Sequence, residues 1–124
     1  MIRVHIICEG QTEEMFVKEI LTDYFEPKEI YLIPTLIGKP GHKGGNVNFE
    51  RLFTDLRARL LSDKTAYCTT LFDFYGLSKN FPGKDEALNC VSVQDKAERL
   101  LDVMTEKLIG QLGEDPLKRL ACIP

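Results

Sequence analysis

The sequence predicts a small α/β fold with a mainly parallel sheet flanked by helices. Three apolar, strand-forming runs alternate with segments whose apolar residues recur at helical spacing, and this order is typical of such folds. The chain has 124 residues, 44% of them hydrophobic, which suffices for one domain with a single core. We expect residues 1–113 to form this domain, and residues 114–124 to be the truncated start of a further element.

The first strand is expected over 2–8, a run rich in Val and Ile whose lack of alternation indicates cover on both faces. A helix follows over 12–25, with Thr12 as its N-cap. The apolar stripe of this helix consists of Phe16, Ile20, Leu21 and Phe25. A second strand over 29–38 contains Pro34, which cannot donate to a neighbouring strand and therefore indicates a sheet edge or a strand end.

A second helix is expected after the glycine-rich stretch, with Asn46 or Asn48 as its N-cap. Its apolar residues at helical spacing are Phe49, Leu52, Phe53, Leu56 and Leu60. The side that faces solvent is expected to carry Arg51, Arg57 and Arg59.

The third strand is expected over 66–76, and the segment 77–89 reads as a loop with a turn at Pro82 and Gly83. A long amphipathic helix follows over 93–112. Its apolar stripe consists of Ala97, Leu100, Leu101, Met104 and Leu108.

Composition excludes several classes of protein. The formal net charge of −3 argues against a polyanion binder that uses its whole surface, so any nucleic-acid contact has to be local. The cysteines Cys8, Cys68, Cys90 and Cys122 lie far apart without a CxxC pair, which argues against a zinc site and for free thiols in a reducing compartment. No apolar run is long enough to span a bilayer. We therefore expect a cytoplasmic protein that does not enter membranes.

Two of the predicted strands end on an acid, the first at Glu9 and the third at Asp73. The carboxyl ends of parallel strands gather at one edge of the sheet, so these carboxylates are expected to meet there. Oxygen ligands of this kind suit Mg²⁺ or Mn²⁺. Gly10 is expected to allow a sharp turn and to leave room for a substrate phosphate. Glu13 either reaches back to this metal site or, like Glu14, only stabilises the first helical turn.

The glycine-rich stretch "GKPGHKGG" brings Lys39, His42 and Lys43 together. It lacks the spacing of a P-loop, because no Ser or Thr follows either lysine. Its cations are expected either to hold phosphates beside the acids or to lie in a solvated connector. His5, within the first strand, is expected to be packed and hydrogen-bonded rather than catalytic.

The end of the first strand at Glu9 and Gly10, with an acid at Glu13 and a later strand that ends in Asp73, resembles the Toprim domain of topoisomerases, primases and related nucleases. The blocks "CEGQTEE", "GGNVNFERL", "TTLFDFYGL" and "FPG" further resemble the bacterial family called domain of unknown function 4276, which looks Toprim-like. This second resemblance covers nearly the whole chain. It implies a Toprim-like, Rossmann-like three-layer domain.

The resemblance also implies residue roles. Glu9 takes the place of the Toprim glutamate, a general acid or base that also touches the metal, and Asp73 takes the place of the first, metal-holding Asp of the Asp-x-Asp motif. Tyr75 stands where the second Asp is expected, so the site has lost one charge or recruits another acid. The acids available for this are Glu13, Asp85 and Glu86. Related members look longer and continue past residue 124.

The function expected on these grounds is a Mg²⁺- or Mn²⁺-dependent, phosphodiester-cleaving domain. The resemblance adds a setting in bacterial defence gene clusters, with an ATPase as partner and nucleic acid as substrate. Two alternatives remain open at this stage. One is a catalytically inactive module that binds nucleic acid or nucleotide at the same edge, and the other is a subunit-interaction domain for the ATPase.

Overall fold

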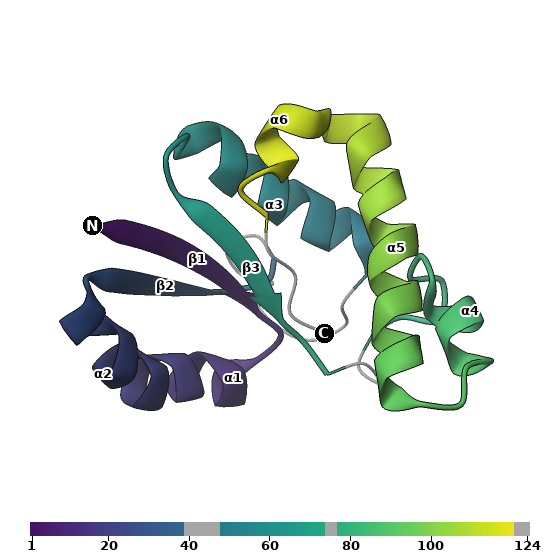
Figure 1. The fold of residues 1–124 in the computed structure, drawn as a ribbon, viewed down its shortest axis with the longest axis horizontal. Helices are drawn as coiled ribbons and strands as arrows, with labels where there is room; N and C mark the ends of the chain where they lie inside the picture. The colour runs from purple at the N-terminus through teal and green to yellow at the C-terminus, as the bar shows by residue number, and fades with distance from the viewer. Residues whose placement is uncertain (39–47, 74–76, 121–124) are drawn as a thin grey trace.

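The computed structural model describes residues 1–38, 48–73 and 77–120 (Figure 1). In these ranges a parallel sheet is formed by β1 (Ile2–Cys8), β2 (Ile30–Leu36) and β3 (Tyr67–Leu71), in the order β2-β1-β3. Helices cover both faces of the sheet. The predicted small α/β fold with a parallel sheet flanked by helices is therefore confirmed.

One face of the sheet is covered by a continuous helical segment that follows β1. It comprises α1 (Gln11–Phe16), the π-helical turn η1 (Val17–Leu21), α2 (Thr22–Phe25) and the 3₁₀ turn η2 (Glu26–Lys28). The core on this face is formed by Ile6, Cys8 and Val17, with Val4, Leu21, Leu32, Leu36 and Leu71 packed around them. In Figure 1 the segment lies along β1 and β2.

The expected start of this helix is wrong, and its expected stripe is only partly correct, because Leu21 packs against this core but two other members are exposed. The N-cap is Gly10 rather than Thr12. Phe16 and Ile20 are 43% and 58% exposed, whereas Val17, which the predicted stripe omits, is fully buried. In the π-helical turn the carbonyl of Val17 accepts from the backbone N–H of Thr22, five residues on. The wider turn departs from the regular 3.6-residue period on which the predicted stripe depends.

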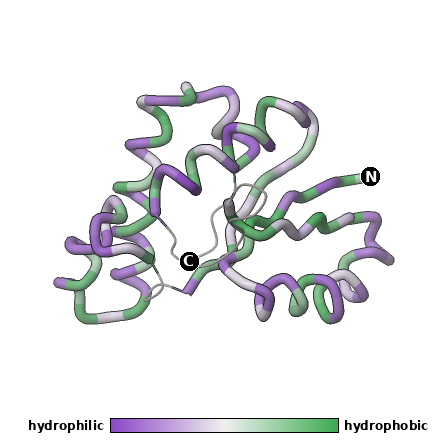
Figure 2. Tube along the Cα trace, turned by 180° about the vertical axis from the view of Figure 1, so that it is seen from behind, coloured by the Kyte–Doolittle hydropathy of each residue, from purple (hydrophilic) through white to green (hydrophobic). Residues whose placement is uncertain are grey.

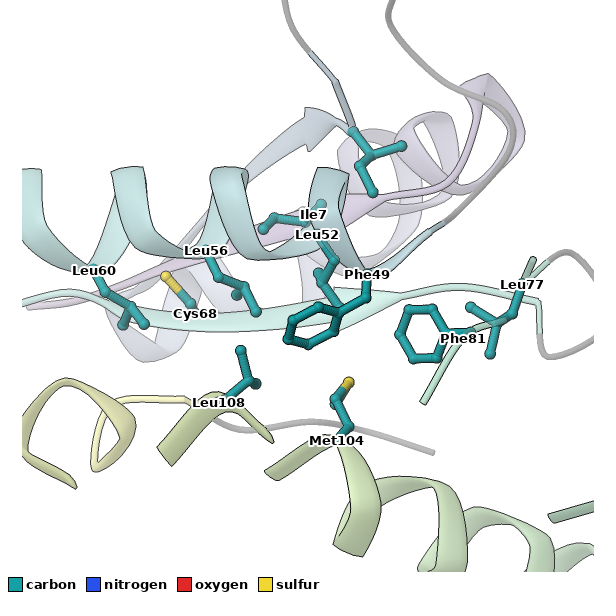
Figure 3. Packing of buried hydrophobic residues seen from close by; sticks show 11 residues of the cluster. Ile7, Phe49, Leu52, Leu56, Leu60, Cys68, Leu77, Phe81, Met104 and Leu108 are labelled. Atoms are coloured by element: carbon teal, nitrogen blue, oxygen red, sulfur yellow. The ribbon is translucent and has the colours of Figure 1, made fainter. Parts of the chain in front are cut away.

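The opposite face carries the larger core, beneath α3 (Phe49–Ser62) and α5 (Val93–Leu112). Figure 3 shows side chains of both helices converging with those of β1 and β3. The buried members are Ile7, Ile37, Phe49, Leu52, Leu56, Leu60, Cys68, Leu77, Phe81, Met104 and Leu108. Hydrophilic and hydrophobic residues alternate along the helices, as Figure 2 shows. Such alternation buries one side of each helix and leaves the other in water.

The expectations for α3 and α5 hold closely. Asn48 is the N-cap of α3, and its side chain accepts from the backbone N–H of Arg51 at 2.9 Å. Four of the five apolar residues expected on α3 are buried, and Phe53 packs against the same core. The bounds of α5 are those expected; Met104 and Leu108 are buried in the core, and Leu100 and Leu101 pack against it.

The segment 77–89, expected as a loop, contains the short helix α4 (Lys84–Leu88). Gly83, its N-cap, has a φ of 88°, and a Cβ there would lie 2.9 Å from the Cβ of Val103. This close approach of the backbone to α5 is a tertiary contact that no local pattern reveals. Lys84 is buried, and its Nζ donates to the carbonyl of Leu77 at 2.6 Å.

Residues 114–120 pack on the same α/β unit. They begin with α6 (Glu114–Leu117), and Leu120 then forms a parallel bridge with Cys68. The guanidinium of Arg119 donates to the carbonyls of Leu60, Asp63 and Ala66 at 2.6, 2.7 and 3.1 Å. Arg119 thus fastens this segment to the end of α3.

β1 has the expected bounds, whereas β2 and β3 are shorter than expected. β2 pairs only with β1 in the described ranges and includes Pro34, which confirms the expected sheet edge. β3 stops at Leu71, two residues before Asp73. Every helix in the described ranges is too short or too polar to cross a bilayer.

Candidate functional site

The acids that follow β1 and β3 lie side by side. Cys8 is paired with Leu71 in the parallel register, and the backbone N–H of Glu9 donates to the carbonyl of Leu71 at 3.2 Å. The backbone N–H of Asp73 in turn approaches Oε2 of Glu9 at 3.4 Å. The structure brings Glu9 and Asp73 to one edge of the sheet, where the Glu9 carboxyl lies against the Asp73 backbone.

Glu13 belongs to the same neighbourhood and has a structural partner. Its Oε2 accepts from the backbone N–H of Gly10 at 3.1 Å, which satisfies a donor at the N-terminus of α1. Of the two roles considered for Glu13, this contact supports the one in which it stabilises the first turn of the helix. The charge of Glu13 also acts on Glu9.

The chain bends at Glu9 and Gly10, as expected, but the bend does not depend on glycine. The φ and ψ of Gly10 are −151° and −176°, an extended conformation that any residue adopts. A Cβ added there would lie 3.4 Å from Oε2 of Glu13, which is an ordinary contact. Neither backbone conformation nor local space therefore requires glycine at this position.

The pKa of the Glu9 carboxyl is raised above its ordinary value. Burial is the largest cause, and the charges of Glu13 and Asp73 add to it, while the hydrogen bond from the Asp73 backbone opposes it. A carboxyl with this shift, at the carboxyl edge of a parallel sheet, is a candidate for proton transfer or cation binding.

In the described part of the chain, no three His, Cys, Asp or Glu side chains are grouped so that they could hold a metal ion. The acids Asp85 and Glu86 lie exposed on α4. Glu9 and Asp73 thus provide two carboxylates that fit a hard cation, without a complete protein ligand set among those residues. Lys39, His42, Lys43 and Tyr75 lie outside the described residues.

Residues 8–116 match the model of the family described as domain of unknown function DUF4276. The chain belongs to this family. No curated protein and no solved structure matches the chain. The matched region of the DUF4276 chain contains Glu9, Asp73 and all the helices that enclose the larger core.

Sequence reasoning missed two residues at this edge of the DUF4276 domain. Arg51, expected on the solvent side, donates from Nη2 to the carbonyl of Ile37 at 3.2 Å. Asp55 accepts from the backbone N–H of Gly38 at 2.8 Å. Residues four apart lie on the same face of a helix. The sequence could therefore have indicated that Arg51 and Asp55 act together at the start of the helix that follows the glycine-rich stretch.

A second charged cluster lies at the exit of α3. Nε2 of His5 is 3.0 Å from Oδ2 of Asp63, and Nη2 of Arg3 is 2.8 Å from Oδ1 of the same carboxylate. His5 is therefore packed and hydrogen-bonded, as expected. The hydrogen bond with His5, followed by the charge of Arg3, lowers the pKa of Asp63.

The thiols of Cys8 and Cys68 are buried in the two cores, as expected for small apolar side chains. Burial raises the pKa of each to about 11. Both therefore stay protonated at neutral pH, which disfavours nucleophilic or metal-binding roles for them.

Proposed function

We propose that this chain is a metal-dependent, phosphodiester-cleaving domain of the Toprim type that uses Mg²⁺ or Mn²⁺. The observation that carries the proposal is the meeting of Glu9 and Asp73 at the carboxyl edge of the sheet, linked by the contact of Oε2 of Glu9 with the Asp73 backbone. The raised pKa of Glu9 supports a role for this carboxyl in proton transfer.

The chain's own residues divide the work as follows. Asp73, exposed beyond the end of β3, presents a carboxylate that would hold the cation. Glu9 would share that cation and move a proton, because burial and its acidic neighbours favour its protonated form. When bound, the ion would neutralise the non-bridging phosphate oxygens and lower the pKa of an attacking water.

The wider setting is also proposed. Cys8, Cys68 and Cys90 are free thiols, which suits a reducing compartment, so a cytoplasmic location is part of the proposal. A nucleic-acid substrate, an ATPase partner and a role in bacterial defence rest on the Toprim-like resemblance alone. The nucleic acid would bind locally at the acidic edge, because the net charge of −3 does not favour a broad contact.

The second candidate function is an inactive module that binds nucleic acid or nucleotide at the same edge. The two-carboxylate arrangement favours it, because no third ligand accompanies the pair within the described ranges. The two candidates differ in catalysis: the nuclease cleaves the phosphodiester bond, whereas the inactive module binds the phosphate group and leaves the bond intact.

Thermal unfolding with Mn²⁺ and with chelator tests the cation site. With a dissociation constant in the millimolar range, ten times that concentration should stabilise the wild type by about 1.4 kcal/mol. Asp73→Asn should abolish this gain, because an amide keeps the shape but loses the charge, and Glu9→Gln should reduce it. Asp102→Asn, which changes an exposed acid on α5, is the matched control and should keep the gain.

The same four proteins are then assayed for cleavage of plasmid and single-stranded DNA. Mn²⁺-dependent cleavage that disappears in Glu9→Gln supports the nuclease. Mn²⁺ binding without cleavage supports the binding module. Equal unfolding curves with Mn²⁺ and with chelator for the wild type would refute the metal site and leave the subunit-interaction domain as the better account.

A further inference from the structure

The first two turns of α3 hold the end of β2 from both sides. Oδ2 of Asp55 accepts from the backbone N–H of Gly38 at 2.8 Å, and Nη2 of Arg51 donates to the carbonyl of Ile37 at 3.2 Å. This N–H and this carbonyl belong to a single peptide group, whose two polar atoms point in opposite directions. Two side chains four residues apart on one helix therefore clamp one peptide plane.

The clamped peptide is joined directly to the acidic edge. The backbone N–H of Ile37 donates to the carbonyl of Cys8 at 2.9 Å, and the other side of the Cys8–Glu9 peptide donates to Leu71 at 3.2 Å. The backbone of Asp73, two residues beyond Leu71, then approaches the Glu9 carboxyl at 3.4 Å. A continuous series of hydrogen bonds thus runs from α3 across all three strand ends to the acid pair.

The helix that supplies the clamp is itself firmly fixed. Its N-cap Asn48 accepts from the backbone N–H of Arg51 at 2.9 Å, and Leu52 and Leu56 are fully buried beneath it. The clamped end is intrinsically less constrained, because Gly38 has a φ of 109°, in the region that glycine adopts most easily. A rigid helix therefore restrains a permissive backbone position.

We propose that Arg51 and Asp55 are positioning residues of the Glu9–Asp73 pair, acting through the Ile37–Gly38 peptide. The role in metal binding rests on the proposed function, whereas the control of the strand ends does not. Carboxylates that share a cation have to be held close to their productive geometry by the residues behind them. Releasing the peptide allows the end of β2 to move, and Cys8 and Glu9 move with it.

The first measurement is amide hydrogen exchange in the metal-free protein, which does not depend on the proposed function. Asp55→Ala should accelerate exchange at Ile37, Gly38 and Glu9, while the amide of Leu108 in α5 stays unchanged. Asp55→Asn keeps an oxygen that accepts from Gly38 and should restore most of the protection. Arg57→Ala, an exposed change on the same helix, is the control and should match the wild type.

The second measurement is the affinity for Mn²⁺ alone, by titration calorimetry. Asp55→Ala should weaken it by about tenfold, as is common for residues that support metal ligands, and Asp55→Asn should recover most of the loss. Arg51→Lys keeps the charge but loses the planar guanidinium group, so its affinity for Mn²⁺ should lie between those of Asp55→Ala and the wild type.

The outcomes separate the two proposals. If Asp55→Ala fails to fold, Arg51→Lys carries the comparison, because it keeps the charge and most of the length of the side chain. Unchanged exchange at Glu9 in folded Asp55→Ala or Arg51→Lys, or acceleration spread equally over α5, would overturn the positioning role. If exchange is accelerated locally in Asp55→Ala but the wild type binds no Mn²⁺, the metal site is refuted and the clamp stays established.

Discussion

Glu9 and Asp63 are carboxylates of one small domain whose pKa values move in opposite directions. Asp63 is hydrogen-bonded to His5 and ion-paired with Arg3, at 3.0 and 2.8 Å, and its pKa is lowered. Glu9 is partly buried beside the acids Glu13 and Asp73, and its pKa is raised. Ionisation of the first carboxyl is favoured by its hydrogen bond with His5 and by the charge of Arg3, whereas ionisation of the second is disfavoured by its burial and its acidic neighbours.

The difference indicates what each region contributes. The hydrogen bond with His5 and the ion pair with Arg3 fasten β1 to the exit of α3, so this cluster favours the folded state at neutral pH. Burial of Glu9, together with the like charges of Glu13 and Asp73, disfavours its ionisation in the folded state, and carboxyls perturbed in this way are candidates for functional sites. The comparison therefore assigns a structural role to Asp63 and makes Glu9 the functional candidate.

The largest loss of stability is expected at the exit of α3, where Arg119 binds. Arg119→Ala removes charged hydrogen bonds to the carbonyls of Leu60, Asp63 and Ala66. We expect a loss of about 2–3 kcal/mol in the free energy of unfolding, measured by urea denaturation. Arg57→Ala, an exposed change on α3, should leave the midpoint unchanged. An equally small effect at Arg119 would mean that the α3 exit is not a stabilising region.

A smaller effect, with a defined pH dependence, is expected for Asp63→Asn. The pKa of Asp63 is lowered in the folded state, so its stabilisation is present above the unfolded pKa and is lost as the pH falls through the folded pKa. Melting temperatures should therefore lie below wild type at pH 7 and converge with it in acid. A constant difference at all pH values would show that the charge of Asp63 is not responsible.

The smallest change in melting temperature is expected for substitution of Glu9, and it should be an increase rather than a decrease. Its folded pKa is raised, so ionisation of Glu9 destabilises the folded state above that pKa and costs nothing below the unfolded pKa. Glu9→Gln should raise the melting temperature slightly at pH 7 without metal, and the gain should vanish in acid. A lower melting temperature for Glu9→Gln at pH 7 would show that the Glu9 charge is compensated, which would end the contrast with Asp63.

Much of the fold could be predicted because it depends on local patterns. The bounds of β1 and α5, the cap at Asn48 and the buried side of α3 follow from strand-forming runs, side-chain capping and regular helical spacing. The meeting of Glu9 and Asp73 could also be predicted, because parallel strands place their carboxyl ends at one edge.

Other features depend on contacts between distant parts of the chain. The π-helical turn after Phe16 departs from the regular helical period, and the short helix α4 begins where the backbone of Gly83 lies close to Val103. The cluster around Asp63 joins residues about 60 positions apart. The contacts of Arg51 and Asp55 with the Ile37–Gly38 peptide also depend on tertiary packing. A hydrogen bond requires a short distance and a suitable direction between two groups, and the spacing of residues along the chain specifies neither.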